Sequence, residues 1–380
     1  MKLEKNGKVM LNRIEVLLGD AQSPGFCYDR NKYFIIALSH YIDAQFRLRP
    51  LSSELFASLR AMNVRGAYKF WDRWAVMVNK GRQPVTSNHI GQYLFVFDNL
   101  TIKVAIDTSD GRHIHNSEIL DWSDLYFKCN YWPDVDYPEK VVPLVNGNGT
   151  LSPAKIRKLA GLRKHEKKYD LVYWSRIWAV QGTSVDDSGV EHNIRIFEAL
   201  AKVEGKTNLL AVFPEEMNSD LLQGYRKRLD EAGVKWQNGW GSINSKALWN
   251  SLASARINFL RPGNHLCVSW RMMDLLCMGA CIVLDGAPFA QWPKPLVDGV
   301  NFIETGCTLS PDYELPSIDR YEQLTSKVSA LIADPDKILQ ISENNIQYFN
   351  EFASMKAVAH YILSIVEQKY PELSALIQAI

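Results

Sequence analysis

Apolar and polar positions alternate regularly along the second half of the chain, from about residue 169 onward. Short apolar runs typical of strands are separated by longer runs in which apolar positions recur with helical spacing. The strand-like runs lie at residues 170–174, 209–213, 234–236, 257–260 and 281–284, and the helical runs at 192–201, 219–233, 246–255 and 268–278. Strands that alternate with helices of this length predict right-handed crossovers and a mostly parallel, doubly wound sheet.

The first half is less regular, yet it holds enough strand-like segments for a second sheet. Apolar runs predict strands at 13–19, 93–97, 102–106, 125–127 and 141–144, and helical spacing predicts helices at 33–42, 53–62 and 68–78. The pattern leaves the order of these strands open. The chain as a whole is therefore predicted to be an α/β protein with two Rossmann-like domains.

A stretch rich in Gly and Asn at residues 146–150 separates the two halves, and a basic run at 155–168 follows it. Such a combination is typical of a solvated linker between domains rather than of a nucleic-acid patch. We expect an N-terminal domain over residues 1–150 and a C-terminal domain over 151–350. Amphipathic helices then run to the end of the chain, and those at 351–380 could pack back on the N-terminal domain.

Composition narrows the class of protein. Hydrophobic residues make up 47% of the 380 positions, charged residues 22%, and the formal net charge is +1. These values are typical of a soluble globular protein, and the near-neutral charge argues against nucleic acid as a partner. No apolar run is long enough to span a membrane, and the N-terminus lacks the apolar core of a signal peptide. We expect a cytoplasmic protein, for which peripheral contact with the inner face of a membrane stays open.

The six cysteines are scattered among apolar residues and form no CxxC pair. We therefore expect buried free thiols in a reducing compartment, and neither a disulfide framework nor a zinc site. They are Cys27, Cys129, Cys267, Cys277, Cys281 and Cys307.

The candidate chemistry of the second half lies between the predicted strands at 257–260 and 281–284. The first strand ends in a loop that contains Asn264, and a helix begins near Ser269. A helix start at the carboxyl edge of a parallel sheet suits a phosphate, because free backbone N–H groups and the helix dipole meet there. Arg271 can add a charged fork, and Asp274, one turn later, can accept hydrogen bonds from ribose hydroxyls. The plainer interpretation is an ordinary ion pair on a surface helix.

These residues resemble a motif of GT-B glycosyltransferases. In that family an acidic residue of a helix stands five positions before a glycine and a short strand, and Asp274, Gly279 and the run 281–284 are similar to this pattern. The Ser-x-Arg-x-x-Asp form is closer to the exostosin-like and DNA-glucosyltransferase versions than to the commonest glycosyltransferase group 1 version.

Two further segments resemble the family. Residues 296–302 are similar to the segment that follows this strand, and Ser175 and Arg176 resemble the family's donor-phosphate loop. The likeness covers roughly residues 169–370. The sequence also departs from the family, because Leu266 stands where many retaining members have a glutamate, so the stereochemistry stays open.

The resemblance implies a GT-B architecture, in which two Rossmann-like domains face a cleft. It also implies a glycosyltransferase, independent of metal or other cofactors, that moves a sugar from a nucleotide sugar to a saccharide or lipid-linked acceptor. Assembly of a surface polysaccharide or lipopolysaccharide is the implied setting. A sugar-nucleotide epimerase of the same architecture and a non-catalytic nucleotide- or carbohydrate-binding protein are the alternatives.

Candidates for the catalytic group lie in the first half, where the predicted strand at 102–106 runs into a polar loop. Asp107, Asp110 and His115 could each remove a proton from an acceptor hydroxyl, although a solvated Asp-Gly turn is the plainer interpretation. His192 and His265 are expected to face the cleft. Three weaker candidates for the acceptor side lie in one aromatic-rich segment, and they are Trp122, Lys128 and Trp132.

Overall fold

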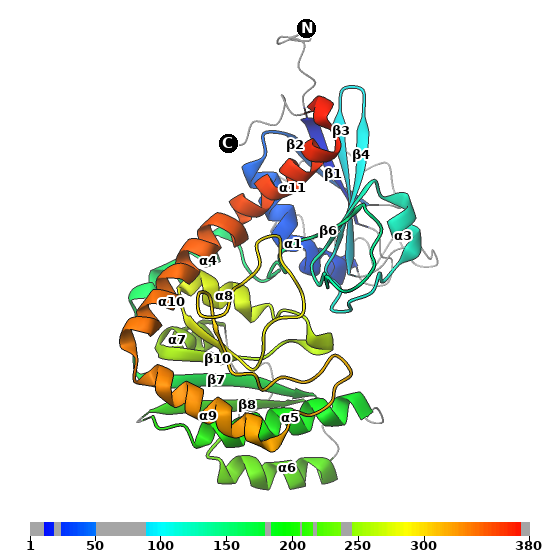
Figure 1. Cartoon of the computed structure of the whole chain (residues 1–380). Helices are drawn as coiled ribbons and strands as arrows, with labels where there is room; N and C mark the ends of the chain where they lie inside the picture. The colour runs from blue at the N-terminus through cyan, green and yellow to red at the C-terminus, as the bar shows by residue number, and fades with distance from the viewer. Residues whose placement is uncertain are drawn as a thin grey trace. The chain divides into compact units, whose positions relative to one another are not determined.

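The computed structural model describes residues 11–18, 24–50, 89–178, 184–205, 207–215, 219–236 and 245–373. The chain divides into two compact units, each coloured along its sequence in Figure 1. Unit 1 comprises Met1–Pro153, Phe289–Pro295 and Asn350–Ile380, and unit 2 comprises Ala154–Pro288 and Leu296–Phe349. The predicted helices at 53–62 and 68–78 lie outside the described residues.

Unit 1 is built on a six-stranded mixed sheet. Its strands are β1 (Leu11–Leu18), β2 (Gln45–Pro50), β3 (Ile90–Phe97), β4 (Thr101–Asp107), β5 (Leu125–Lys128) and β6 (Val141–Pro143), in the order β2-β1-β3-β4-β5-β6. β3 runs antiparallel to both β1 and β4, while the other neighbours are parallel. The strands predicted from apolar runs are present. β2 and a short helix, α3 (Ser117–Trp122), were not predicted from the sequence.

Two helices far apart in sequence pack together in unit 1, α1 (Pro24–Tyr41) and α11 (Met355–Lys369). The Tyr33 hydroxyl of α1 donates to the carbonyl of Ala353, 2.6 Å away, just before α11 begins. Gly147 lies so close to α1 that an added Cβ would stand 2.8 Å from the Tyr33 ring. The stretch 146–149 is therefore buried, and its interpretation as a solvated linker is wrong, because glycine serves here for close packing.

Unit 2 carries the parallel sheet that the sequence predicted. Its strands are β7 (Tyr169–Trp178), β8 (Asn208–Glu215), β9 (Lys235–Trp236), β10 (Ala255–Leu260), β11 (Cys281–Leu284) and β12 (Ile303–Glu304), in the order β12-β11-β10-β7-β8-β9. All five neighbouring pairs are parallel. The strand order reverses between β7 and β10, as in a doubly wound dinucleotide-binding fold. The α/β class of both domains is confirmed.

Helices cover both faces of the unit 2 sheet (Figure 1). They are α5 (Ser184–Ala201), α6 (Ser219–Glu231), α7 (Ser245–Ala253), α8 (Arg271–Met278), α9 (Ile318–Ile332) and α10 (Pro335–Tyr348). The main core lies under α5 and α9, where Tyr173 of β7, Phe197 of α5 and Leu324 of α9 are fully buried. Every strand and helix predicted after residue 169 is present, with shifted ends.

The basic run at 155–168 is also more than a solvated linker. It forms α4 (Pro153–Gly161) and a following turn, and two of its side chains reach carbonyls at helix ends. Arg163 Nε donates to the carbonyl of Cys277 at the end of α8, and Lys167 Nζ to that of Ala253 at the end of α7. Cations at these positions complement the helix dipole.

The cysteine prediction holds for the part of the chain whose side chains are described. Five cysteines are buried there and form no disulfide, while the Cys27 side chain lies outside this part. Burial raises the pKa of the Cys281 and Cys307 thiols to about 12. Within the described ranges no helix is long and apolar enough to cross a membrane.

Candidate functional site

The carboxyl edge of the unit 2 sheet is uneven at the point where its strand order reverses. The pairing of β7 with β10 stops at Tyr173, opposite Phe259, whereas its pairing with β8 continues to Trp178. Ser175 and Arg176 therefore lie inside β7, which continues past the strand end predicted at residue 174. Within the described residues the ladder between β7 and β10 ends at Tyr173, and α/β folds bind ligands at such a reversal point.

The helix α8 begins near the point where the pairing of β7 with β10 ends. Its first residue is Arg271, two positions later than predicted, and the backbone N–H of Arg271 lies 3.4 Å from the Ser269 hydroxyl oxygen. The Arg271 guanidinium donates through Nη1 to the carbonyl of Trp174. This bond places the arginine of the motif against the open side of β7, directly before Ser175.

Asp274 faces a different part of the fold. Its side chain is buried, and Oδ2 accepts a hydrogen bond of 3.0 Å from the Trp249 indole of α7. The Trp249 ring is covered by the ammonium groups of Lys155 and Lys158, at 5.9 and 5.8 Å from its centroid. The interpretation of Arg271 and Asp274 as a surface ion pair is therefore wrong, because Asp274 is buried and the two side chains bond to different elements.

Gly279 ends α8 before the next strand, as the motif predicts. It ends α8 with φ 64° and ψ 45°, in the left-handed region where glycine is favoured. A Cβ at this position would lie 2.5 Å from Cγ1 of Ile346 in α10. The glycine thus allows α8 to end close to α10 before β11 begins.

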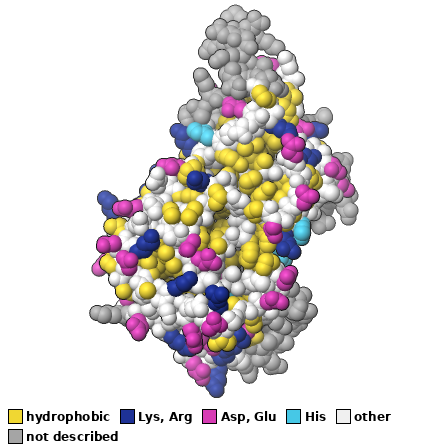
Figure 2. Space-filling view, in the orientation of Figure 1, with side chains coloured by type: hydrophobic (Ala, Val, Ile, Leu, Met, Phe, Trp, Pro, Cys, Tyr) yellow, Lys and Arg dark blue, Asp and Glu magenta, His cyan; other side chains and the backbone are white. Residues whose placement is uncertain are grey.

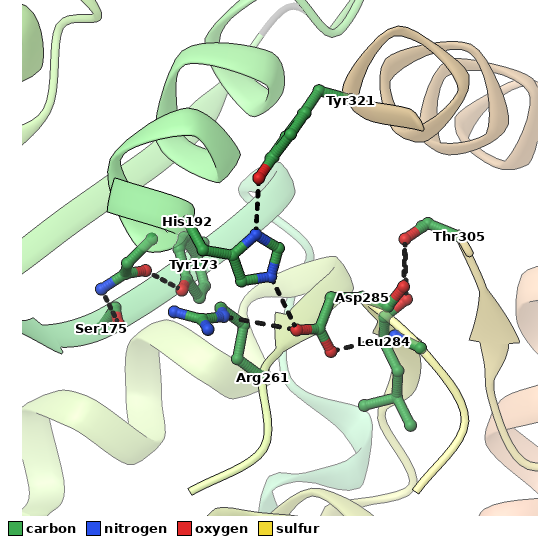
Figure 3. A network of polar contacts seen from close by, with 10 residues as sticks. Tyr173, Ser175, His192, Arg261, Leu284, Asp285, Thr305 and Tyr321 are labelled. Atoms are coloured by element: carbon green, nitrogen blue, oxygen red, sulfur yellow. Dashed lines mark hydrogen bonds and ion pairs between the residues drawn. The ribbon is translucent and has the colours of Figure 1, made fainter. Parts of the chain in front are cut away.

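A buried polar network lies at the ends of β10 and β11 (Figure 3). Arg261 is the first residue after β10 and Asp285 the first after β11, and the last residues of these strands, Leu260 and Leu284, are in register. Asp285 is 1% exposed. Its Oδ2 accepts from Arg261 Nε at 3.3 Å, and its Oδ1 from the backbone N–H of Gly286 at 3.0 Å.

His192 of α5 completes this network (Figure 3). Its ring is fully buried, with Nε2 3.4 Å from Asp285 Oδ2 and Nδ1 2.8 Å from the Tyr321 hydroxyl. Burial, together with the charge of Arg261, lowers the His192 pKa to about 4. The imidazole is therefore neutral at physiological pH, and the contact with Asp285 is a hydrogen bond from Nε2–H rather than an ion pair. The expectation that His192 faces a cleft is wrong.

A second chain of hydrogen bonds fixes the end of β7. The Tyr173 hydroxyl donates to Asn193 Oδ1 at 2.5 Å, and Asn193 Nδ2 donates to the Ser175 hydroxyl at 2.9 Å. Burial raises the Tyr173 pKa, while nearby Arg261 and the hydrogen bond with Ser175 act in the opposite direction. Figure 3 shows the Arg261 guanidinium between Asp285 and this chain.

The loop between β10 and α8 closes the remaining side of the site. Asn264 begins a short 3-10 turn there, and its side chain lies outside the described part. His265 and Leu266 both have positive φ, 54° and 56°, which is uncommon for residues other than glycine. His265 is exposed. A small, mainly apolar hollow lies under this loop, and Arg261, Ser269, Leu266, Met272 and Gly286 are among its lining residues.

The catalytic candidates of unit 1 differ in how deeply they are buried. Asp107 is fully buried, and its carboxylate accepts hydrogen bonds from the Ser109 N–H, the Tyr126 hydroxyl and the Lys128 ammonium, at 2.8, 2.9 and 3.0 Å. This geometry favours a structural role over the proposed role as a base. Lys128 is buried as its partner, so it lacks the exposure that contact with an acceptor requires.

The other two unit 1 candidates lie nearer the surface. Asp110 pairs with Arg30 of α1 at 3.5 Å, and the exposed ring of His115 meets the edge of His89 at 5.6 Å between centroids. Burial lowers the His89 pKa, as does nearby Arg30. The four side chains form one titratable cluster at the end of β4.

The aromatic candidates for the acceptor side also differ. Trp132 is 2% exposed and stacks on Phe289 at 4.9 Å, so its predicted contact with an acceptor is wrong. Trp122 is half-buried, with the Lys103 ammonium 6.0 Å from its ring.

Sequence reasoning missed Arg261 and Asp285 in unit 2, and Arg30 and His89 in unit 1. The sequence did contain a signal for Arg261 and Asp285. Both residues directly follow predicted parallel strands, and polar residues at that position lie at the ligand-binding edge of the sheet. Arg30 and His89 carried no such signal, because their proximity to Asp110 depends on the strand order of unit 1.

Comparisons with known proteins find similarity only among solved structures. No protein-family model matches the chain, and no curated protein matches it in sequence. The structure of Alr3699/HepE from Anabaena in complex with UDP is similar over 94% of this chain and 100% of its own, with a TM-score of 0.45 and 11% identity.

Two further solved structures are similar over smaller parts of the chain. The C-terminal domain of a group 1 family glycosyl transferase, LpcC of Francisella tularensis, matches over 52% of this chain and 92% of its own, with a TM-score of 0.35 and 15% identity. A glycosyltransferase from Rickettsia africae ESF-5 matches over 67% of this chain and 65% of its own, with a TM-score of 0.40 and 12% identity. Two of these three structures are glycosyltransferases by name, and the third contains UDP.

Proposed function

We propose that the protein is a glycosyltransferase whose nucleotide-sugar site lies at the carboxyl edge of the unit 2 sheet. The observation that carries the proposal is the bond from Arg271 to the Trp174 carbonyl, at the point where the strand order reverses. A guanidinium held at this position can bind the phosphates of a donor, since its planar fork matches phosphate oxygens.

The reaction requires that the nucleotide leave the anomeric carbon of the sugar as an acceptor hydroxyl attaches to it. Negative charge builds up on the departing phosphate, and a cation fixed beside it stabilises that charge. Arg271 has this role in our proposal, with the hydroxyls of Ser175 and Ser269 and the nearby Arg176 as further phosphate contacts. Neither a metal nor another cofactor is part of the proposal.

The remaining donor contacts are also proposals. The Asp274 carboxylate, which Trp249 orients, accepts a hydrogen bond from a ribose hydroxyl. Asn264 provides a further donor contact from the loop before α8. Because Asp274 is buried, this contact requires the donor to reach the Trp249 side of α8. The acceptor is a saccharide or a lipid-linked saccharide, as in assembly of a surface polysaccharide or lipopolysaccharide at the inner face of a membrane.

Asp110 and His115 are the proposed source of the catalytic base in unit 1, where they cluster with Arg30 and His89. A carboxylate or a neutral imidazole can take the proton of an acceptor hydroxyl. The Asp107 carboxylate takes part only by fixing the end of β4, from which this cluster extends.

Calorimetric titration with UDP, GDP, CMP and their sugars tests the donor site. We expect one nucleotide to bind, and Arg271→Ala to weaken it by about tenfold or more, as for loss of a charge-assisted hydrogen bond. Arg226→Ala, on the exposed face of α6, is the matched control and should bind as the parent does. If no nucleotide binds, or if Arg271→Ala binds normally, the site is misplaced.

Transfer assays separate the enzyme from its alternatives. Release of nucleotide that depends on an added glycan supports a transferase. Binding without hydrolysis or transfer to any glycan supports a non-catalytic binding protein, and interconversion of the free nucleotide sugar supports an epimerase.

A further inference from the structure

The first residues after β10 and β11 form an arginine–carboxylate pair at the proposed donor site. Arg261 lies at the reversal point of the strand order, next to the open end of β7, and it lines the same hollow as Ser269. The Asp285 carboxylate that holds it is fully buried and fixed on both oxygens. The arginine is therefore oriented before any ligand arrives.

The geometry of this pair leaves the far end of the guanidinium free of carboxylates. Asp285 bonds to Nε, so Nη1 and Nη2 extend beyond it toward Tyr173 and the end of β7 (Figure 3). These two nitrogens make up the fork that matches two oxygens of one phosphate.

The same strand carries a second arginine–aspartate pair, which provides a comparison. Arg256, near the amino end of β10, donates through Nη1 to Asp170 at 3.0 Å and through Nη2 to the carbonyl of Ile332 at 2.8 Å. Both terminal nitrogens of Arg256 are thus used within the fold. The Arg261 side chain bonds to Asp285 and to Tyr173, stays 15% exposed, and lies at the edge where ligands bind.

A neutral histidine stabilises the carboxylate of this pair. The Asp285 carboxylate can only accept, so it places the proton of the neutral His192 ring on Nε2, and Nδ1 then accepts from the Tyr321 hydroxyl. A buried carboxylate is costly unless it is fully hydrogen-bonded, and an outer shell of this kind fixes the orientation of groups that contact a ligand.

We propose that Arg261 is a further phosphate-binding residue of the donor site, and that Asp285, His192 and Tyr321 are positioning residues that aim its guanidinium at the end of β7. This inference rests on the proposed function, since it names a contact within the same site. It adds a further guanidinium to those of Arg271 and Arg176.

Nucleotide affinity and stability, measured together on two substitutions in one strand, test the inference. Arg261→Gln should weaken binding of the nucleoside diphosphate that the parent binds by about tenfold or more. Arg256→Gln removes the same type of pair from the other end of β10 and should leave that affinity within about twofold of the parent, the expectation for a residue without ligand contact. Thermal unfolding of both variants shows whether their losses of stability are similar.

Two more variants keep the test decisive. Arg261→Lys retains the charge but not the fork, so it should also weaken binding, and it replaces Arg261→Gln if that variant does not fold. Tyr321→Phe leaves Arg261 intact and should weaken binding of inorganic pyrophosphate in the same direction but less strongly.

The outcomes separate the two proposals. If the parent binds no nucleotide, the proposed function itself is wrong. If the parent binds and Arg261→Gln or its lysine replacement binds equally well, Arg261 is a structural residue and only the further inference is overturned. If Arg256→Gln loses as much nucleotide affinity as Arg261→Gln, the further inference is also overturned. The loss of affinity would then come from loss of stability and not from loss of a ligand contact.

Discussion

Replacing Asp107 by asparagine distinguishes a structural carboxylate from a catalytic one. The side chains of Asp107 and Lys128 are both 0% exposed, and their charged groups lie 3.0 Å apart in neighbouring positions of β4 and β5. Asparagine keeps the size and one acceptor oxygen but removes the charge, so the Lys128 ammonium stays buried without its counterion. Breaking a buried pair in this way costs about 3–5 kcal/mol.

Scanning calorimetry measures the consequence. For a domain of this size each kcal/mol shifts the midpoint by about 2–4 °C, so Asp107→Asn should lower the unit 1 transition by roughly 6–20 °C. Adding Lys128→Met should restore most of the loss, because the double variant has no unpaired buried charge. Lys369→Met serves as the control, since its pair with Glu139 spans 3.8 Å at the surface and should contribute nothing measurable.

Turnover of the same variants completes the test. If Asp107 is structural, Asp107→Asn loses activity only as far as it loses folded protein, and the double variant regains both together. A variant that keeps its transition within about 2 °C of the parent and still loses turnover would refute the structural assignment. Asp107 would then be a base, as the sequence first suggested.

Three further substitutions follow from the packing and the titration of buried groups. Gly279→Ala should destabilise unit 2 more than Gly233→Ala, because both glycines have positive φ but only the Cβ at 279 meets Ile346; equal midpoints in urea would contradict this. The unfolded His192 imidazole takes up a proton near pH 6.5 while the folded one stays neutral down to about pH 4, so parent stability should fall by about 3 kcal/mol across this range as pH decreases. His192→Gln should lack this part of the pH dependence, which urea unfolding at several pH values would show. Tyr33→Phe should cost about 1–2 kcal/mol in unit 1, because it leaves the Ala353 carbonyl without its donor, and an unchanged unfolding free energy would count against that bond.

The sequence predicted unit 2 well because its elements carry their own signal. The strand β11 is buried on both faces, so it appears as a short continuous apolar run, and the helices between the strands keep an apolar stripe. The motif around Arg271 could also be placed, since a residue after a parallel strand lies at a known edge. Gly279 was predictable for the same reason, as a helix end that precedes a strand.

The errors arose where partners come from distant parts of the chain. Asp107 resembles a residue of a polar loop until the register of β4 and β5 places Lys128 opposite it. His192 has the polarity of an exposed residue, yet Asp285 and Tyr321 provide it with two partners inside the fold. Gly147 resembled part of a linker because its closeness to Tyr33 depends on how α1 packs. Each of these contacts is set by tertiary structure that no local pattern contains.

The interrupted course of unit 1 along the sequence determines when that unit can be completed during protein synthesis. Trp132 packs on Phe289, which lies between the two segments of unit 2 in the sequence, and α1 packs on α11, which follows unit 2. An emerging chain that ends at residue 349 contains all of unit 2 but still lacks α11, the helix that packs on α1. On the ribosome, unit 2 can therefore finish folding first, and the N-terminal segment must wait for the C-terminal helix while its apolar α1 face is uncovered.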